Sequence, residues 1–129
     1  MKNKHAALLY KSTDLLKSTE PQDAKAMLLN CLDELINSIG VFHKNVIPNP
    51  NNFRKKSSSF SRALTILYIL QSSIDFEKHL SIAKNLFQIY EYTRVALINE
   101  FKSCKLDKSQ TAVNALKEIR DSWREVKDV

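Results

Sequence analysis

The chain has 129 residues and a net charge of +6 at pH 7, with one glycine and three prolines. So few residues that tolerate turn conformations exclude an all-β fold, because its many turns need them. A chain of this length can bury enough apolar surface to fold without a metal or a disulfide. We therefore expect a single helical-bundle domain over residues 1–129, of the all-α class.

The cysteines, Cys31 and Cys104, lack metal-ligand or redox spacing, which is typical of a protein from a reducing compartment. No run of about 20 apolar residues could span a bilayer, and the N-terminus lacks the apolar core of a signal peptide. These features predict a cytosolic protein with no membrane insertion.

Most of the positive charge lies in one segment. Five cationic residues fall where there is no acid: Lys44, Arg54, Lys55, Lys56 and Arg62. The rest of the chain is close to neutral, which disfavours a nucleic-acid-binding face. Our hypothesis is that this charge is solvated, so replacing residues 54–56 with Ser would barely change stability or binding.

Two helices are predicted in the first third of the chain. Residues 4–17 have loose apolar periodicity, and a helix of this length is marginal alone. Thr19 then offers an N-cap with Gln22 three residues later, and Pro21 suits the first helical turn. Over residues 24–42, apolar side chains recur at three- and four-residue steps, which predicts a strongly amphipathic helix.

Three further helices follow a loop at residues 45–57, which contains two prolines and a cluster of asparagines. The next helix begins near Ser57–Ser59 and runs to Ser73. Its β-branched and aromatic content would also suit a buried strand, but the lack of a partner strand favours a helix. A fourth helix is predicted from about residue 76 to 102, and a fifth from Asp107. The fifth carries an apolar stripe: Val113, Leu116, Ile119, Trp123 and Val126.

No catalytic or metal-binding pattern is present in the sequence. The histidines, His5, His43 and His79, lie in three segments without a Cys or carboxylate at ligand spacing, and the last two are expected at the surface near helix ends. There is no HExxH sequence, glycine-rich phosphate loop or nucleophile motif. We therefore expect no enzyme activity, no cofactor and no metal. The charged residues between 117 and 125 predict an ordinary solvated helix face with i,i+4 pairs.

The fourth predicted helix is apolar around most of its circumference. With residues placed 100° apart, its apolar side chains spread over about 240°, whereas a helix facing one core needs about 100°. One explanation is that the helix is contacted from several sides. Another, compatible with the first, is that part of this surface is a groove for an apolar client segment, which the helix at 4–17 could cover. Leu86 and Ile89 are expected in the core. The candidate client contacts are Tyr10, Phe87, Tyr90, Ile98 and Phe101.

Several segments resemble one protein family. Residues 74–92 read IDFEKHLSIAKNLFQIYEY and resemble the pattern L-D-x-E-x-G-G-x-I-A-x-N-L-x-x-L-Y-x-Y. Residues 21–29, PQDAKAMLL, resemble P-x-E-L-x-x-M-L-Y, and Leu97 fits an R-L further on. Residues 119–123, IRDSW, resemble L-R-D-x-W. These patterns are those of the FliS family of flagellin-specific export chaperones, and the resemblance covers about residues 15–126.

The sequence departs from the family pattern at both ends of the fourth helix. His79 and Leu80 replace paired glycines, which predicts either a continuous helix start or a reshaped turn. Glu100 and Phe101 replace the small residue and the asparagine that close the helix in the family pattern. The chain is therefore interpreted as a divergent member or a paralogue.

The resemblance implies an antiparallel four-helix bundle with a short extra N-terminal helix. The implied client is the C-terminal region of flagellin, held unpolymerised in the cytosol and delivered to a component of the flagellar export gate. Two alternatives stay open. One is a helical adaptor or chaperone for a different secreted or regulatory protein, and the other is a basic nucleic-acid-binding module that uses residues 53–62.

Overall fold

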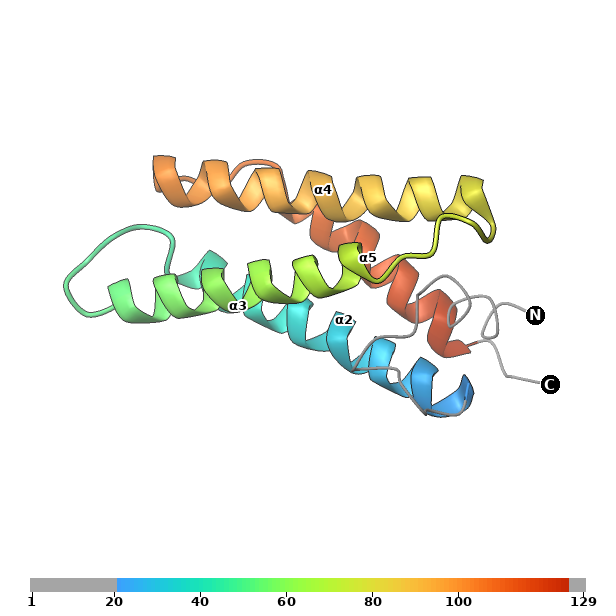
Figure 1. Ribbon diagram of the computed structural model, residues 1–129. Coiled ribbons are helices and arrows are strands. Elements are labelled where there is room, and N and C mark those ends of the chain that lie inside the picture. The colour runs from blue at the N-terminus through green and yellow to red at the C-terminus, as the bar shows by residue number, and fades with distance from the viewer. Residues whose placement is uncertain (1–20, 126–129) are drawn as a thin grey trace.

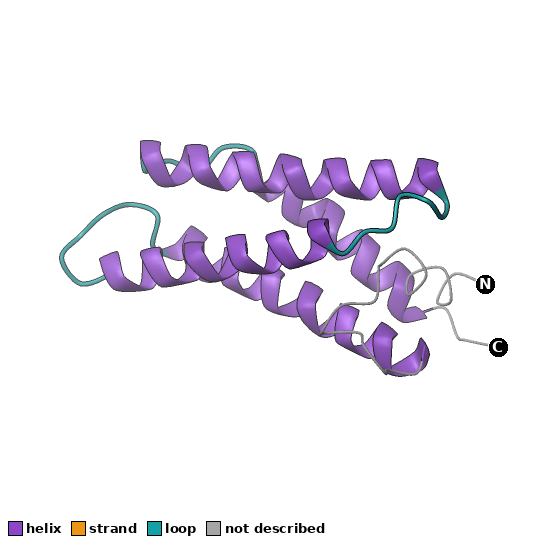
Figure 2. Cartoon of the chain, in the orientation of Figure 1, coloured by secondary structure: helices purple, strands orange, loops and turns teal. Residues whose placement is uncertain are grey.

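The computed structural model describes residues 21–125, which form a bundle of four helices (Figure 1). The helices are α2 (Pro21–Lys44), α3 (Phe53–Ser72), α4 (Leu80–Ser103) and α5 (Ser109–Glu125). Consecutive helices run antiparallel, and Figure 2 shows no strand in this part of the chain. The all-α prediction is confirmed, whereas the predicted helix at 4–17 and the Thr19 cap lie outside the described residues.

The four helices form a ring in which each packs on two neighbours. α2 packs on α3 and α5, and α4 packs on the same two helices from the other side, so α2 and α4 lie diagonally across the bundle. The predicted α2 stripe faces the core, where its largest side chains are at most 1% exposed: Leu28, Leu32, Leu35, Ile39 and Phe42. Burying each such side chain contributes about 1.5–3 kcal/mol, so α2 supplies much of the core's stability.

The loop between α2 and α3 is shorter than predicted, because α3 begins at Phe53 rather than near Ser57. Asparagine side chains organise the loop: Asn49 Oδ1 accepts a hydrogen bond from the backbone N–H of Asn51 (2.8 Å), and Asn52 Nδ2 donates to the carbonyl of Ile47 (2.9 Å). The polar first turns of α3 have no apolar periodicity, so the sequence pattern did not predict that this part of the chain is helical.

Lys56 in the first turns of α3 is 3% exposed, so the hypothesis that residues 54–56 are all solvated is wrong for this residue. Its Nζ lies 4.9 Å from the centre of the Phe101 ring and 3.2 Å from Cys104 Sγ. Phe101 in turn stacks on Phe60 of α3, with 4.3 Å between ring centres. The Lys56 ammonium therefore covers an aromatic cluster that joins α3 to α4.

Both ends of α4 have a residue in the left-handed region of the backbone map. His79 precedes the helix with φ 49°, and Cys104 follows it with φ 59°. Before His79, Asp75 Oδ1 accepts a hydrogen bond from the backbone N–H of Glu77 (3.0 Å). Residues 75–79 therefore form a turn, and α4 begins at Leu80, so the predicted start at about residue 76 is wrong. The reshaped turn is confirmed at His79, where the family's glycine would adopt this conformation at less cost.

A buried carboxylate holds the N-terminus of α5. Glu100, 1% exposed, accepts hydrogen bonds from the backbone N–H groups of Asp107 (3.0 Å) and Ser109 (2.8 Å). It also accepts a 2.6 Å hydrogen bond from the Ser109 hydroxyl. A carboxylate placed here accepts hydrogen bonds from N–H groups that have no partner within the first helical turn. Its negative charge also interacts favourably with the positive end of the helix dipole.

His43 of α2 extends this buried network. Because the Ser109 hydroxyl donates to Glu100, the 2.6 Å contact between His43 Nε2 and Ser109 Oγ is donated by the histidine. The pKa of His43 lies below its ordinary value, because burial lowers it by more than the nearby Glu100 carboxylate raises it. His43, predicted at the surface near a helix end, is therefore half-buried and hydrogen-bonded to Ser109, whereas His79 is exposed as expected.

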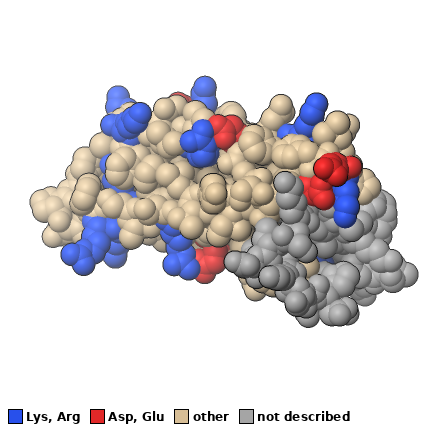
Figure 3. All heavy atoms as spheres, viewed as in Figure 1, with Lys and Arg blue, Asp and Glu red and all other residues tan. Residues whose placement is uncertain are grey.

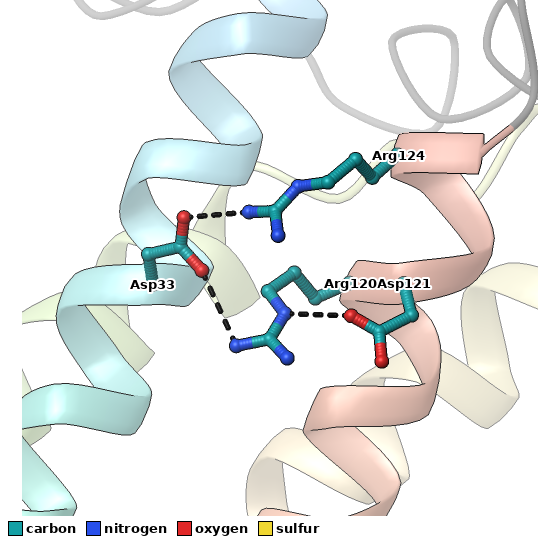
Figure 4. Close-up of polar contacts among 4 residues, drawn as sticks. All are labelled: Asp33, Arg120, Asp121 and Arg124. Carbon is teal, nitrogen blue, oxygen red and sulfur yellow. Dashed lines mark hydrogen bonds and ion pairs between the residues drawn. The ribbon is translucent and has the colours of Figure 1, made fainter.

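Further along α5, arginines tie the helix to α2 (Figure 4). Arg124 Nη2 donates to Asp33 Oδ2 (2.8 Å), and Arg120 Nη1 approaches Asp33 Oδ1 (3.4 Å). Arg120 Nε also donates to the neighbouring Asp121 (2.9 Å). The prediction that this charged strip is only a solvated face is therefore wrong, because two of its arginines contact another helix.

Candidate functional site

The first surface groove lies between α2 and α3 and has a volume of about 510 Å³. We call it the α2/α3 groove. Its apolar lining consists of Met27 and Cys31 from α2 and Ile66 from α3. Burial raises the pKa of the Cys31 thiol, so this side chain stays protonated and acts as a small apolar group. Glu34 and Arg62 form a half-exposed ion pair beside the groove, with 3.1 Å between Oε1 and Nε.

The second groove lies between α4 and α5 and has a volume of about 500 Å³. This α4/α5 groove is lined by Ile89 and Tyr92 from α4 and by Ala112 and Ala115 from α5. The small alanine side chains leave space beside the tyrosine ring, which is 44% exposed. The two grooves share no helix, so a chain occupying both would have to pass around the bundle.

The grooves suit a polypeptide partner. Each offers partly exposed apolar side chains along the seam between two helices, a surface that an amphipathic segment can cover with its own apolar face. Within residues 21–125, no group of three His, Cys, Asp or Glu side chains is placed to hold a metal ion. None of the described helices is long and apolar enough to cross a membrane.

The structure does not bring the predicted client contacts together. Tyr90 is fully buried, so a client could reach it only if the surrounding residues moved. Phe101 is half-buried in the stack with Phe60. Phe87 is half-buried against Phe76, with 5.7 Å between ring centres, and Ile98 is half-buried without lining either groove. Tyr10 lies outside the described residues.

Two residues of α4 that line the α4/α5 groove, Ile89 and Tyr92, are not among the predicted client contacts. Tyr92 lies in the same apolar arc as Tyr90, but it points to the α5 side and keeps an exposed ring. Ile89 is partly buried against the core and also lines this groove, whereas Leu86 is buried as expected. Tyr92 and Ile89 are three residues apart, so the sequence already places them on the same face of the helix. Only the position of α5 shows that this face borders a groove.

The fold is a four-helix bundle with an apolar groove on each of two seams that share no helix. The family model described as Flagellar protein FliS matches residues 2–129, and the chain belongs to this family. The family consists of flagellar secretion chaperones for flagellin and is not an enzyme family. No curated protein and no solved structure matches the chain.

Proposed function

We propose that this protein binds the C-terminal segment of flagellin in the cytosol, keeps it from polymerising, and hands it to the flagellar export apparatus. Family membership supports flagellin as the client, and the observation that carries the binding mode is the pair of open apolar grooves on separate seams. A client that passes from one groove to the other covers more apolar surface than either groove alone can offer.

The physical requirement is a long interface. A disordered client loses conformational freedom when it binds, and ordering costs several kcal/mol that apolar contacts must offset. Two grooves of about 510 and 500 Å³ on seams that share no helix allow the client to form separate contacts joined by a connecting segment. Joining two weak contacts in one chain raises the overall affinity, because the second contact forms intramolecularly.

Two exposed tyrosines provide a matched test of the α4/α5 groove. Tyr92 lines this groove, whereas Tyr68 of α3 is 70% exposed and lines neither groove. Tyr92→Ser should weaken binding of a flagellin C-terminal peptide by more than about tenfold, as loss of an aromatic anchor often does. Tyr68→Ser should leave the affinity unchanged. Calorimetric titration measures both affinities, and circular dichroism confirms that both variants are folded.

The α2/α3 groove has its own variant, Ile66→Glu, which places a charge on the apolar lining. Binding should weaken by a similar factor, and combining it with Tyr92→Ser should lower the affinity further. If the wild-type protein fails to bind the flagellin peptide, the proposed client is wrong. If it binds the peptide and all three variants behave alike, the client is right and the grooves are not its site.

A further inference from the structure

A third pocket lies where the α2–α3 and α4–α5 loops meet at one end of the bundle, with a volume of about 470 Å³. The pocket is lined from the α2 side by His43, Lys44, Val46 and Ile47, and from the α4–α5 loop by Cys104, Lys105 and Leu106. We call this surface the loop-end pocket. It shares no lining residue with the α2/α3 groove or the α4/α5 groove.

Exposed positive charge surrounds the loop-end pocket. Segments 44–55 and 102–108 carry six exposed cationic side chains: Lys44, Arg54, Lys55, Lys102, Lys105 and Lys108. Asp107 is the one exposed acid in these segments. In Figure 3 the end of the molecule that holds the α2–α3 loop, at the left, shows Lys and Arg side chains and no Asp or Glu on the visible face. The resulting field attracts an acidic partner and disfavours a basic one.

Large apolar side chains stand among these charges. Ile47 is 72% exposed and Leu106 is 51% exposed, and both line the pocket. Phe53, 61% exposed, begins α3 at the same end of the bundle. Isolated exposed apolar residues are ordinary, but two that line one concave surface provide an anchoring point for an apolar side chain of a partner.

Both loops that form the pocket are held by hydrogen bonds. Asn45 Nδ2 donates to the carbonyl of Val41 (2.8 Å), and Asn52 Nδ2 donates to the carbonyl of Ile47 itself (2.9 Å). On the other side, the buried Glu100 carboxylate accepts from the backbone N–H of Asp107 (3.0 Å). A surface that is already ordered loses little freedom on binding, which favours its use in recognition.

We propose that the loop-end pocket binds an acidic protein segment with a large apolar anchor side chain, at a site separate from the flagellin grooves. The lysines attract the acidic residues, and the anchor fills the space between Ile47 and Leu106. A nucleic-acid strand would satisfy the charges but would leave these aliphatic side chains without a suitable partner. A flat membrane surface would not fill a concave pocket. The site therefore adds a second partner to the proposed chaperone function.

The test uses a defined probe, a fluorescein-labelled peptide with glutamates on both sides of a central Leu-Phe-Leu. Its controls are the same peptide with Gln in place of Glu and the same peptide with Ser in place of the apolar residues. A single-stranded DNA oligonucleotide and vesicles with anionic phosphatidylserine provide the two other classes of ligand. Fluorescence anisotropy or co-sedimentation measures binding, and amide shifts in nuclear magnetic resonance spectra locate it.

The acidic apolar peptide should bind and shift the amides of residues 44–53 and 104–108. The double variant Lys44→Glu/Lys105→Glu should weaken it by at least about tenfold, since each charge pair becomes repulsive. Ile47→Ser should weaken it by about fivefold or more through loss of the anchor contact. The matched control Lys84→Glu/Lys117→Glu changes the net charge equally at exposed positions on α4 and α5 and should leave the affinity within about twofold.

Several results would overturn the proposal. These are a failure of the acidic apolar peptide to bind, equal binding of either control peptide, and equal weakening by the two double variants. Preferential binding of DNA or vesicles at this surface would assign it to another ligand class. Binding of the flagellin peptide in the presence of saturating probe separates the sites: competition would place the loop-end pocket within the client interface, whereas independent binding supports a second partner.

Discussion

Helix α5 is held to the bundle in two chemically different ways along its length. At its N-terminus, the buried carboxylate of Glu100 accepts three hydrogen bonds from Asp107 and Ser109. Towards its C-terminus, Arg120 and Arg124 contact Asp33 where the aspartate is 43% exposed. Both contacts join charged groups to α5, but water competes for the second and is excluded from the first.

The difference shows that burial, and not the number of charges, decides what a polar contact contributes. An exposed ion pair replaces contacts with water that were nearly as favourable, so its net contribution is small. A buried group that loses its partner has no water to replace it, so the full cost of desolvation appears. Substitutions at the two ends of α5 should therefore differ in effect by several-fold.

The largest effect is expected from Glu100→Ala. The substitution removes the acceptor of the half-buried Asp107 N–H group and of the buried Ser109 N–H and hydroxyl groups, which should lower the free energy of unfolding by about 3 kcal/mol. Urea unfolding followed by circular dichroism measures the change. Glu100→Gln keeps one acceptor oxygen and should cost less. A loss below about 1 kcal/mol for the alanine variant would show that the hydrogen bonds to Glu100 contribute little to stability.

The next effect separates two adjacent lysines. Lys56→Ser removes a buried aliphatic stem and the ammonium above Phe101, and should lower stability by about 2 kcal/mol. Lys55→Ser, at an exposed neighbour, should change it by less than about 0.5 kcal/mol. Paired urea titrations measure both. Equal small effects would restore the original hypothesis that this basic segment is merely solvated.

A smaller effect is expected at the exposed end of α5. Asp33→Ala removes the shared partner of Arg120 and Arg124 and should cost below about 1 kcal/mol, less still in high salt because the ions screen these charges. Thermal melts at low and high salt measure the loss. A cost comparable to that of Glu100→Ala would contradict the distinction between the two ends.

The smallest effect concerns pH. Burial holds the pKa of His43 below its ordinary value of about 6.5, so the folded state binds this proton less readily than the unfolded state. The contribution to stability is therefore complete above pH 6.5 and declines as the pH falls towards the folded-state pKa. His43→Gln retains a donor for Ser109 and should reduce this slope between pH 7.5 and 5.5. Urea midpoints at the two pH values test it, and an unchanged slope would contradict the assignment.

The departures from the family pattern lie at the two ends of α4, where the substituted residues adopt an unusual backbone conformation or contact another helix. His79 occupies a left-handed conformation where the pattern has glycine. Glu100 and Phe101, which replace a small residue and an asparagine, supply the carboxylate for α5 and the ring beneath Lys56. The sequence identified each position as unusual, and the structure shows what the substituted side chains contact.

The amino-acid pattern was sufficient to predict the helices of residues 21–125 and their assembly into a bundle. The apolar stripes of α2 and α5, including Leu32 and Leu116, are local properties, because an amphipathic helix must bury its apolar face wherever it packs. The start of α3 was predicted four residues too late, because its polar first turn has no such stripe.

Only the tertiary structure decided which parts of the apolar arc on α4 are core and which are surface. Tyr90 and Tyr92 are two residues apart and chemically identical, yet one is fully buried and the other is 44% exposed. Periodicity gives the angle of a side chain about its own helix, whereas burial depends on where α3 and α5 lie around that helix. The same reason explains why the burial of Lys56 and Glu100 could not be predicted from the sequence. Both are charged residues, and they are buried only because the ends of the four helices meet around them.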